Sequence, residues 1–521
     1  MPPGSHLGQT LFLPFLAIEV QNLFLNVARK PTRARYLRVR VCLINPPRIQ
    51  PKVWGKPNVF PPIGLAYVAA VLEKSHEVSI IDAPTEGWRN LEDAGRSTYR
   101  VGLSDEQIAE KLRQFKPEVV GVEVPFSGWS KAAFAVTAIA KEINNHVVTY
   151  LDGQHPSAMP KECLHNQNTD FVVIGERENT VLELVNGLEQ DLDDFSIVKG
   201  LGFVKNGKPI LTPPRPVIED LDSLPFPARH LLPMDVYTKA VRENPLRGEI
   251  FKPMTIMITS RGCPFNCVFC SNYIVWGKRW RARSPENVVA EMEHVVKNYG
   301  IEQIDFYDDN MTLNRKRMED ICDLIMKRNV RVEWFTPNGI RADTLDEGLL
   351  RKMKRAGCKK IRLAPESGVQ RVVDEVVGKS LDLKSVEQAV ILSKKVGIGV
   401  GLFFVIGLIG ETKTEIEETI RFAYRLKRLG GESFIFSIAT PIYGTQLYDK
   451  AKQGGFLKEG FCDEALAGVE PLIETPEFTA EELQELCMRA NLVNPTFTRG
   501  KLVRAIKNPK RTLQMIFRGK S

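Results

Sequence analysis

Three cysteines in one short segment are the residues of this chain best suited to chemistry. Cys263, Cys267 and Cys270 have a C-x3-C-x2-C spacing and follow the apolar run 254–258, which has the composition of a buried strand. Three thiolates this close can each bind a different iron of one cubane [4Fe–4S] cluster while the loop wraps one face. Because the cubane has four irons, three protein ligands leave one iron able to bind another molecule. The spacing therefore predicts a cluster with an open coordination site.

Zinc and a disulfide are the alternatives for this segment. A structural zinc site usually has four protein ligands in two pairs, and no second pair lies nearby in the sequence. A disulfide framework is disfavoured because nine cysteines in 521 residues are few. The other six are isolated and read as ordinary small core residues: Cys42, Cys163, Cys322, Cys358, Cys462 and Cys487.

The cysteine motif resembles the signature of the radical S-adenosylmethionine (SAM) superfamily. The resemblance implies that the three cysteines are both the metal ligands and the catalytic residues, and that Phe269 packs on the adenine of SAM. Strand-like runs alternate with helices from the apolar run onward, which predicts six β/α repeats and a partial (β/α)6 barrel. The five further runs are 303–307, 332–335, 360–364, 400–407 and 433–438.

Polar and glycine residues follow three of these predicted strands. By the same resemblance, Asp308, Asp309 and Asn310 bind the amino group of SAM, since carboxylate and amide oxygens accept from an ammonium. Glu366 and Ser367 resemble the ribose site, and Gly407 and Gly410 resemble the adenine site. Each set taken alone could be a solvated loop or a helix cap, and Glu411 could be only a first-turn acid.

The preceding part of the chain also alternates strands and helices. Strand-like runs at 39–45, 76–82, 118–124, 147–153 and 170–175 predict a doubly wound, Rossmann-like parallel sheet, whose ligand site lies at the carboxyl ends of the strands. This block resembles the cobalamin-binding domain that precedes the radical SAM domain in one large subfamily. The resemblance implies that the following residues contact cobalamin: Pro46, Pro47, Gly64, Gly153, Gln154, His155, Gly175 and Glu176.

His155 is a poor candidate for a cobalt ligand. The D-x-H-x-x-G motif of other cobalamin enzymes is absent, and His155 lies in the segment Gly153-Gln154-His155-Pro156 instead. A histidine at the rim of a sheet more often makes hydrogen bonds. The related subfamily generally lacks the motif too, so its absence leaves the cobalamin prediction intact.

The whole pattern resembles a class B radical SAM methyltransferase. Motifs at 102–105, 276–277 and 366–371 are similar to those of the hydroxyethylphosphonate C-methylases of fosfomycin biosynthesis. This implies methylation of an unactivated carbon through a 5′-deoxyadenosyl radical and methylcobalamin, with flavodoxin or ferredoxin as the external electron donor. Ring formation or contraction without methyl transfer is the alternative. A non-catalytic electron carrier is disfavoured, because three ligands leave one iron exposed.

Composition and charge set the remaining expectations. The 43% hydrophobic and 26% charged residues suit a globular protein of two or three domains. We predict an extension at 1–38, a cobalamin-binding domain at 39–200, a proline-rich linker at 201–252, a radical SAM domain at 253–455 and a C-terminal element at 456–521. Thiol ligands of a cluster favour a reducing, cytoplasmic compartment.

The net charge of +8 belongs to the C-terminal tail. Residues 493–521 contain eight basic residues and no acidic one. A basic amphipathic tail either contacts an anionic membrane surface or is simply solvated, and both alternatives stay open. The apolar run 11–18 is too short to span a bilayer. A small molecule or a lipid is the expected substrate, and no motif indicates nucleic-acid binding.

Overall fold

The structure is a computed structural model that describes residues 38–55, 57–95, 97–243 and 252–494. The predicted N-terminal extension and the basic C-terminal tail lie outside these residues, apart from their inner boundaries. No helix in the described part of the chain is long and apolar enough to cross a membrane.

The first sheet has seven strands in the order β10-β9-β8-β7-β6-β1-β3. All five predicted strands are present and pair in parallel: β1 (Arg40–Asn45), β3 (Glu77–Asp82), β6 (Val119–Glu123), β7 (Val148–Asp152) and β8 (Phe171–Val173). Helices connect them: α1 (Ile63–Leu72), α2 (Ala83–Glu86), α3 (Asp105–Phe115), α4 (Ser130–Ile143), α5 (Gln154–Ala158), α6 (Pro160–Leu164) and α7 (Glu178–Glu189). This confirms the doubly wound α/β fold.

The sheet extends beyond the predicted boundary at residue 200. Strands β9 (Leu201–Lys205) and β10 (Lys208–Leu211) form an antiparallel hairpin on β8, inside the segment that we predicted to be a linker. Pro209 contributed to the linker prediction, yet it lies in an edge strand, where the missing N–H costs little. The remaining linker contains the helix α8 (Met234–Glu243).

Helix α1 is buried on nearly all sides. Nine of its ten residues are buried, although a surface helix would have one polar face. The same apolar cluster contains Leu43 of the first sheet together with Met254 and Ile256 of β11 (Met254–Met257). Helix α1 is therefore packed between the two halves of the described chain.

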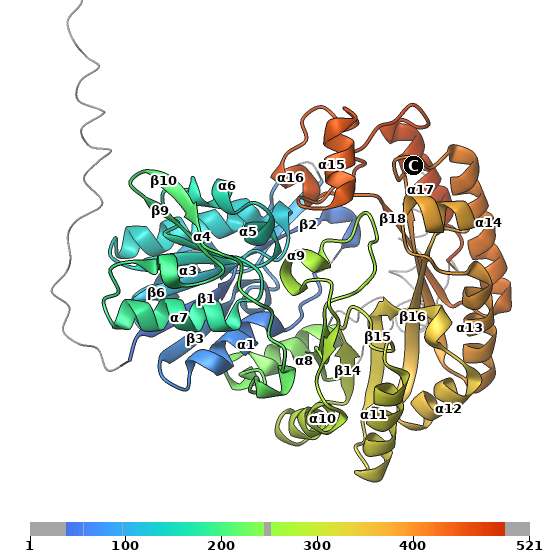
Figure 1. Cartoon of the computed structure of the whole chain (residues 1–521), viewed down its shortest axis with the longest axis horizontal. Coiled ribbons are helices and arrows are strands. Elements are labelled where there is room, and N and C mark those ends of the chain that lie inside the picture. The colour runs from blue at the N-terminus through green and yellow to red at the C-terminus, as the bar shows by residue number, and fades with distance from the viewer. Residues whose placement is uncertain (1–37, 56, 96, 244–251, 495–521) are drawn as a thin grey trace, which may run out of the picture. The chain divides into compact units, whose positions relative to one another are not determined.

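The second sheet has six parallel strands in sequence order, as predicted for a partial barrel. After β11 they are β14 (Gln303–Phe306), β15 (Glu333–Ile340), β16 (Cys358–Glu366), β17 (Gly399–Ile406) and β18 (Ser433–Ile438). The helices between them cover one face of the sheet (Figure 1): α10 (Pro285–Tyr299), α11 (Arg315–Lys327), α12 (Glu347–Arg355), α13 (Leu383–Val396) and α14 (Lys413–Leu429).

Smaller elements were not predicted. β2 (Arg48–Pro51), β5 (Thr98–Val101) and β4 (Leu91–Asp93) form an antiparallel sheet in a region that reads as loop. β12 (Ser260–Arg261), β13 (Arg281–Ala282) and α9 (Asn272–Trp276) flank the cysteine loop. Helix α15 (Gln446–Gln453) ends the predicted radical SAM domain. The C-terminal element contains α16 (Asp463–Leu466) and α17 (Ala480–Asn491), and α17 packs against the second sheet.

Candidate functional site

The three cysteines lie in the loop between β12 and α9 and are free and half-buried. The Cys270 amide donates a hydrogen bond to the Cys267 carbonyl (3.0 Å), which makes the loop turn between these residues. Burial raises the pKa of Cys267 to about 11 and that of Cys270 to about 12. Thiols this buried need a metal nearby to act as thiolate ligands at neutral pH.

The donor set of this loop fits a cluster. In the described residues, no three Cys, His, Asp or Glu side chains converge as one metal ion would require. A cubane distributes its ligands over separate irons, so its three thiolates need not converge on one point. Cys462, which we predicted to be an ordinary core residue, is exposed and lies outside the loop.

Asp308 follows β14 as predicted, but its carboxylate already has protein donors. It accepts hydrogen bonds from the Thr259 amide (3.2 Å), the Thr259 hydroxyl (2.7 Å) and the Ser260 hydroxyl. Burial raises the pKa of Asp308, and the nearby Arg317 opposes this rise. Asp308 therefore holds the strand that leads into the cysteine loop, and its predicted contact with SAM stays a prediction.

Asp309 and Asn310 each have one side-chain oxygen without a hydrogen-bond donor in the described part of the chain. One oxygen of Asp309 accepts from the Asn272 side chain (2.5 Å), two residues beyond Cys270. Asp309 Oδ2 and Asn310 Oδ1 are buried and have no donor in hydrogen-bonding geometry among the described residues, while the Gly262 amide lies near the Asp309 carboxylate. Burial raises the pKa of Asp309 to about 7, and Asp308 adds to the rise. Two neighbouring unsatisfied acceptors suit the ammonium of SAM.

Glu366 and Ser367 lie at the end of β16. Glu366 has a left-handed backbone (φ 66°), which is costly for a non-glycine residue, and its carboxylate pairs with Lys379 Nζ (2.6 Å). Ser367 is buried and shares a hydrogen bond with Thr419 (2.9 Å). Part of the hydrogen-bonding capacity of this pair is thus already used within the protein, and its predicted contact with the ribose stays a prediction.

The loop after β17 is held by Glu411. Its carboxylate accepts from the amides of Gly407 (2.8 Å) and Leu408 (3.2 Å). Gly407 and Gly410 both have positive φ, and a Cβ on Gly407 would collide with Leu483 of α17. Glu411 lies before the cap of α14, so it fastens the loop and is not the first-turn acid that we had considered.

Phe269 lies in the same apolar cluster as Ile409. The cluster also takes in Cys267 and residues of β17 and α15, so it joins the cysteine loop to the loop after β17. The structure therefore brings Phe269 close to the loop that contains Gly407 and Gly410, and the contacts of these residues with adenine stay predictions.

The predicted cobalamin contacts lie at the carboxyl ends of the first sheet. Pro46 and Pro47 are buried after β1, and Gly153 (φ 109°) and Gly175 (φ 79°) have left-handed backbones after β7 and β8. The Gln154 amide nitrogen donates to the Tyr443 carbonyl (3.3 Å), while its Oε1 is buried without a donor among the described residues. The positive φ values let a ligand approach the backbone closely.

His155 faces protein groups on both sides of its ring. Nδ1 lies 3.0 Å from the Ser127 hydroxyl, and Nε2 lies 3.8 Å from a carboxylate oxygen of Asp463. Burial lowers the pKa of His155. Asp463 is fixed by hydrogen bonds from Ser130 (2.7 Å) and Tyr443 (2.8 Å). This geometry favours a hydrogen-bonding role for His155 over cobalt ligation.

Gly64 and Glu176 serve contacts that the sequence did not indicate. A Cβ on Gly64 would collide with the guanidinium of Arg177, which is buried and pairs with Glu123 (2.6 Å) and Asp152. Glu176 pairs with Arg281 (2.6 Å) of β13. Both residues keep their place near the predicted corrinoid site, and their contacts with cobalamin stay predictions.

Sequence reasoning also missed a set of residues that join the two halves of the chain. Arg261 of β12 pairs with Glu178 of α7 at 2.5 Å, and both side chains are buried. No spacing or composition marks these residues, because their partners are 83 positions apart. Their juxtaposition follows only from the packing of the two domains.

Comparisons with known proteins identify the family of the chain. Residues 257–423 match the model of the radical SAM superfamily, and residues 57–185 match that of the B12 binding domain. An uncharacterized methyltransferase of Pyrococcus horikoshii is 35% identical over 434 residues, which cover 82% of this chain and 86% of the relative. The chain belongs to the family of radical SAM methyltransferases with a B12-binding domain.

One further relative and one solved structure extend the comparison. The cytidylyl-2-hydroxyethylphosphonate methyltransferase of Streptomyces wedmorensis is 30% identical over 493 residues, covering 89% of this chain and 90% of the relative. The methyltransferase TsrM of Kitasatospora setae, solved with cobalamin and a [4Fe–4S] cluster, shares the fold with a TM-score of 0.63 at 17% identity. That match covers 81% of this chain and 79% of TsrM. The cofactors of the B12-binding radical SAM enzyme are therefore a [4Fe–4S] cluster, SAM and cobalamin.

Proposed function

We propose that this protein methylates an unactivated carbon of a small molecule, as a cobalamin-dependent radical SAM C-methyltransferase. The observation that carries the proposal is the pair of buried, unsatisfied acceptors Asp309 Oδ2 and Asn310 Oδ1 beside the three-cysteine loop. An ammonium that binds these acceptors would place SAM next to the cluster. The adjoining B12-binding domain and the methyltransferase names of the two relatives favour methyl transfer.

The described residues divide the work of binding. Cys263, Cys267 and Cys270 would hold the cluster, and Asp309 with Asn310 would orient the amino group of SAM. The adenine would lie against Phe269, and Glu366 with Ser367 would meet the ribose. When bound, the cluster supplies the electron for reductive cleavage of SAM, and cobalamin supplies the methyl group.

Cobalamin would lie at the rim formed by Pro46, Gly153, Gln154 and Gly175. The buried Oε1 of Gln154 can accept from an amide of a corrinoid side chain. The electron would come from an external reductant such as flavodoxin or ferredoxin. Membrane contact through the tail remains a prediction, because the tail lies outside the described residues.

Labelled SAM tests the proposal directly. The reconstituted protein is incubated with methyl-labelled SAM, a reductant, cobalamin and a small-molecule extract, and products that gain label are identified by mass. Methylation predicts a labelled product heavier than its precursor by one CH2 group. SAM cleavage with a new product that carries no label would instead establish the ring-forming or ring-contracting alternative.

The cluster assignment has its own test and control. Cys267→Ala removes one predicted ligand, and we expect 5′-deoxyadenosine formation to fall at least 100-fold, because the cluster loses one of three protein anchors. Cys462→Ala is the matched control, since Cys462 is exposed and outside the loop. Cleavage activity that survives in Cys267→Ala would contradict the assignment.

A further inference from the structure

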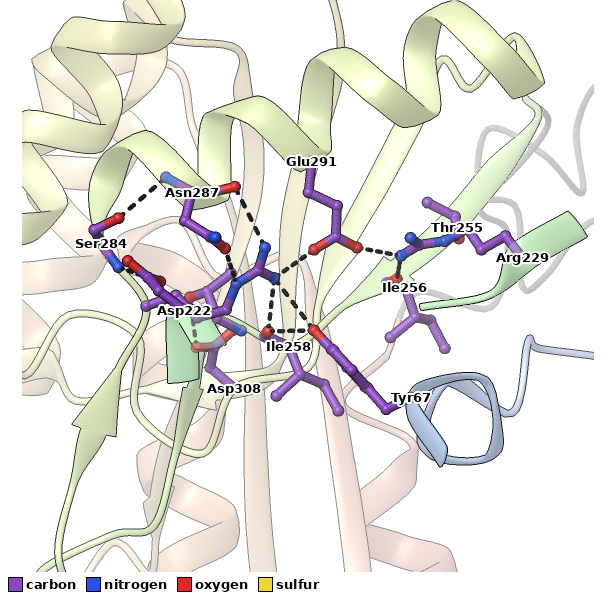
Figure 2. Close-up of polar contacts among 12 residues, drawn as sticks. Tyr67, Asp222, Arg229, Thr255, Ile256, Ile258, Ser284, Asn287, Glu291 and Asp308 are labelled. Atoms are coloured by element: carbon purple, nitrogen blue, oxygen red, sulfur yellow. Dashed lines mark hydrogen bonds and ion pairs between the residues drawn. The ribbon is translucent and has the colours of Figure 1, made fainter. Parts of the chain in front are cut away.

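Tyr67 lies where the two halves of the described chain meet. It belongs to α1 of the B12-binding domain and is 4% exposed. Its hydroxyl is 3.3 Å from Arg283 Nη1 and 3.5 Å from the Ile258 carbonyl, both of which belong to the radical SAM domain. The Arg261 guanidinium lies 5.3 Å from the centre of its ring. Figure 2 shows the Tyr67 side chain reaching from α1 toward Ile258.

A buried ion network surrounds the hydroxyl of Tyr67. Arg283 pairs with Glu291 of α10, and Glu291 also pairs with Arg229 of the linker at 2.6 Å (Figure 2). Arg229 donates to the Ile256 carbonyl (2.8 Å) and Arg283 to the Ile258 carbonyl (3.2 Å). The network thus holds the carboxyl end of β11, the strand that precedes the cysteine loop.

The network continues to the proposed SAM site. Arg317 of α11 donates to the carbonyls of Arg283 (2.8 Å) and Thr259 (2.9 Å). Thr259 in turn donates to Asp308 through its amide and hydroxyl. An unbroken series of hydrogen bonds therefore runs from Tyr67 in the B12-binding domain to Asp308 beside the SAM amino site.

The ring face of Tyr67 reaches the cysteine loop by a second route. Arg261 lies between the rings of Tyr67 and Trp276, 4.5 Å from the centre of the latter. A guanidinium over an aromatic face is attracted by the ring quadrupole, and more strongly when both are buried. Arg261 comes two residues before Cys263, so this contact fixes the base of the loop.

The protonation state of Tyr67 suits this junction. Burial raises its pKa to about 12, and the adjacent Glu291 adds to the rise. The phenol therefore stays protonated at neutral pH, and the hydroxyl can donate to the Ile258 carbonyl while it accepts from Arg283.

We propose that Tyr67 is a positioning residue that fixes the B12-binding domain against the strand leading into the cluster loop, and so aligns the methyl donor with the SAM site. The proposal rests on the proposed methyltransferase function. The cost of misalignment is expected to appear in methyl transfer, because SAM contacts only the radical SAM domain in the proposed site. A small shift of one reacting group relative to another is enough to lower a rate substantially.

The amount of methylated product formed per 5′-deoxyadenosine, which we call the coupling ratio, tests the proposal on the holoenzyme. Tyr67→Phe removes only the hydroxyl, and Tyr67→Leu also removes the ring face. In Tyr67→Phe, which keeps the ring over Arg261, we expect the rate of 5′-deoxyadenosine formation and the KM for SAM to stay within about twofold of wild type, while methylated product per 5′-deoxyadenosine falls about 3- to 10-fold. In Tyr67→Leu we expect this ratio to fall further. An unchanged ratio in both variants would overturn the proposal.

Tyr237→Phe is the matched control. Tyr237 is a buried tyrosine of the same apolar cluster, and its hydroxyl donates to Asp82 (2.5 Å) within the first half of the chain. Its loss removes a buried tyrosine hydrogen bond whose acceptor, Asp82, lies in the B12-binding domain. We expect the coupling ratio of Tyr237→Phe to match that of the wild type. An equal fall of the ratio in Tyr67→Phe and Tyr237→Phe would show that Tyr67 contributes only to stability, and it would refute the proposal.

Amide hydrogen exchange separates this proposal from the proposed function. In Tyr67→Phe, exchange should accelerate in 63–72 and 254–261 relative to Tyr237→Phe, because these segments meet at the hydroxyl. If the wild type made no methylated product, the proposed function would fail, and the exchange data would still decide the role of Tyr67. Unchanged exchange in both segments would then overturn it.

Discussion

Individual side chains at the proposed SAM site differ in how much of their hydrogen-bonding capacity is already used. Asp308 accepts three hydrogen bonds from Thr259 and Ser260, whereas Asp309 Oδ2 and Asn310 Oδ1 accept none from the described residues. Buried acceptors without donors are costly, and a bound ligand is one way in which a native structure satisfies them. At the scale of single residues, Asp309 is therefore the better candidate for contact with SAM, and Asp308 the one that supports the loop.

Replacing Asp309 should weaken SAM binding. In Asp309→Asn the charge-assisted hydrogen bond to the ammonium is lost, which corresponds to about 1.5 to 3 kcal/mol, or about a 10- to 100-fold higher Kd. Equilibrium dialysis with the reconstituted protein measures this. Asp320→Asn, which removes an exposed carboxylate of α11, is the control. An unchanged Kd would show that the ammonium binds elsewhere.

Single elements show how the loops of the site are held. The loop after β17 depends on Glu411, whose carboxylate is fully buried and binds two loop amides. Helix α17 packs over the same loop, since a Cβ on Gly407 would collide with Leu483. The C-terminal element, whose role the sequence left open, thus supports the predicted adenine site.

Protonation of the Glu411 carboxylate should make the free energy of unfolding depend on pH. Burial raises its pKa from the ordinary 4.5 to about 8, so the folded state favours the protonated form. This stabilisation is fully present below pH 4.5, declines as the pH rises, and is lost above about pH 8, with a slope on the order of 1 kcal/mol per pH unit.

Urea unfolding at pH 5, 6.5, 8 and 9 measures this decline. Wild type should lose stability relative to Glu411→Gln between pH 5 and 8, and the difference should become constant above pH 8. Glu481→Gln is the control, because Glu481 is largely exposed on α17. Parallel curves for wild type and Glu411→Gln would show that Glu411 keeps an ordinary pKa.

The molecule as a whole is joined by buried charges as well as by apolar packing. Glu291 lies between Arg229 and Arg283, and all three side chains are buried. Such networks contribute little net stability when intact, yet they are costly to break, because the remaining charges stay buried without a counter-ion. The network therefore favours one arrangement of the domains mainly because any other arrangement would leave buried charges without a counter-ion. It adds little to the free energy of unfolding.

Removing the charge of Glu291 should therefore be severe. Glu291→Gln leaves two buried guanidinium groups uncompensated, and we expect the free energy of unfolding to fall by about 3 to 5 kcal/mol, measured by urea denaturation. Glu387→Gln, which breaks an exposed pair with Arg425, should cost less than about 1 kcal/mol. Equal costs for the two variants would mean that Arg229 and Arg283 find other partners.

The two sheets and the cysteine loop could be predicted because the sequence patterns that indicate them are local. Alternating apolar runs and closely spaced thiols can be seen within a few residues. The hairpin β9–β10 was missed because prolines dominate its surroundings, and it forms only by pairing with β8. Tyr67 and Arg283 are 216 positions apart, so no local sequence pattern predicts their contact. Residue types suited to bind cofactors can thus be recognised in the sequence, whereas contacts between the two domains cannot.

The contact of Asp463 with Ser130 has a consequence for how the protein is made. These residues are 333 positions apart, and Gly128 has no side chain where the backbone of Ala467 lies against it. Protein domains generally fold in order as the ribosome releases them. Here His155 and Ser130 remain accessible to water until Asp463 and the rest of α16 have been synthesised. The first domain to leave the ribosome is consequently completed only after the second sheet and α16 have been synthesised.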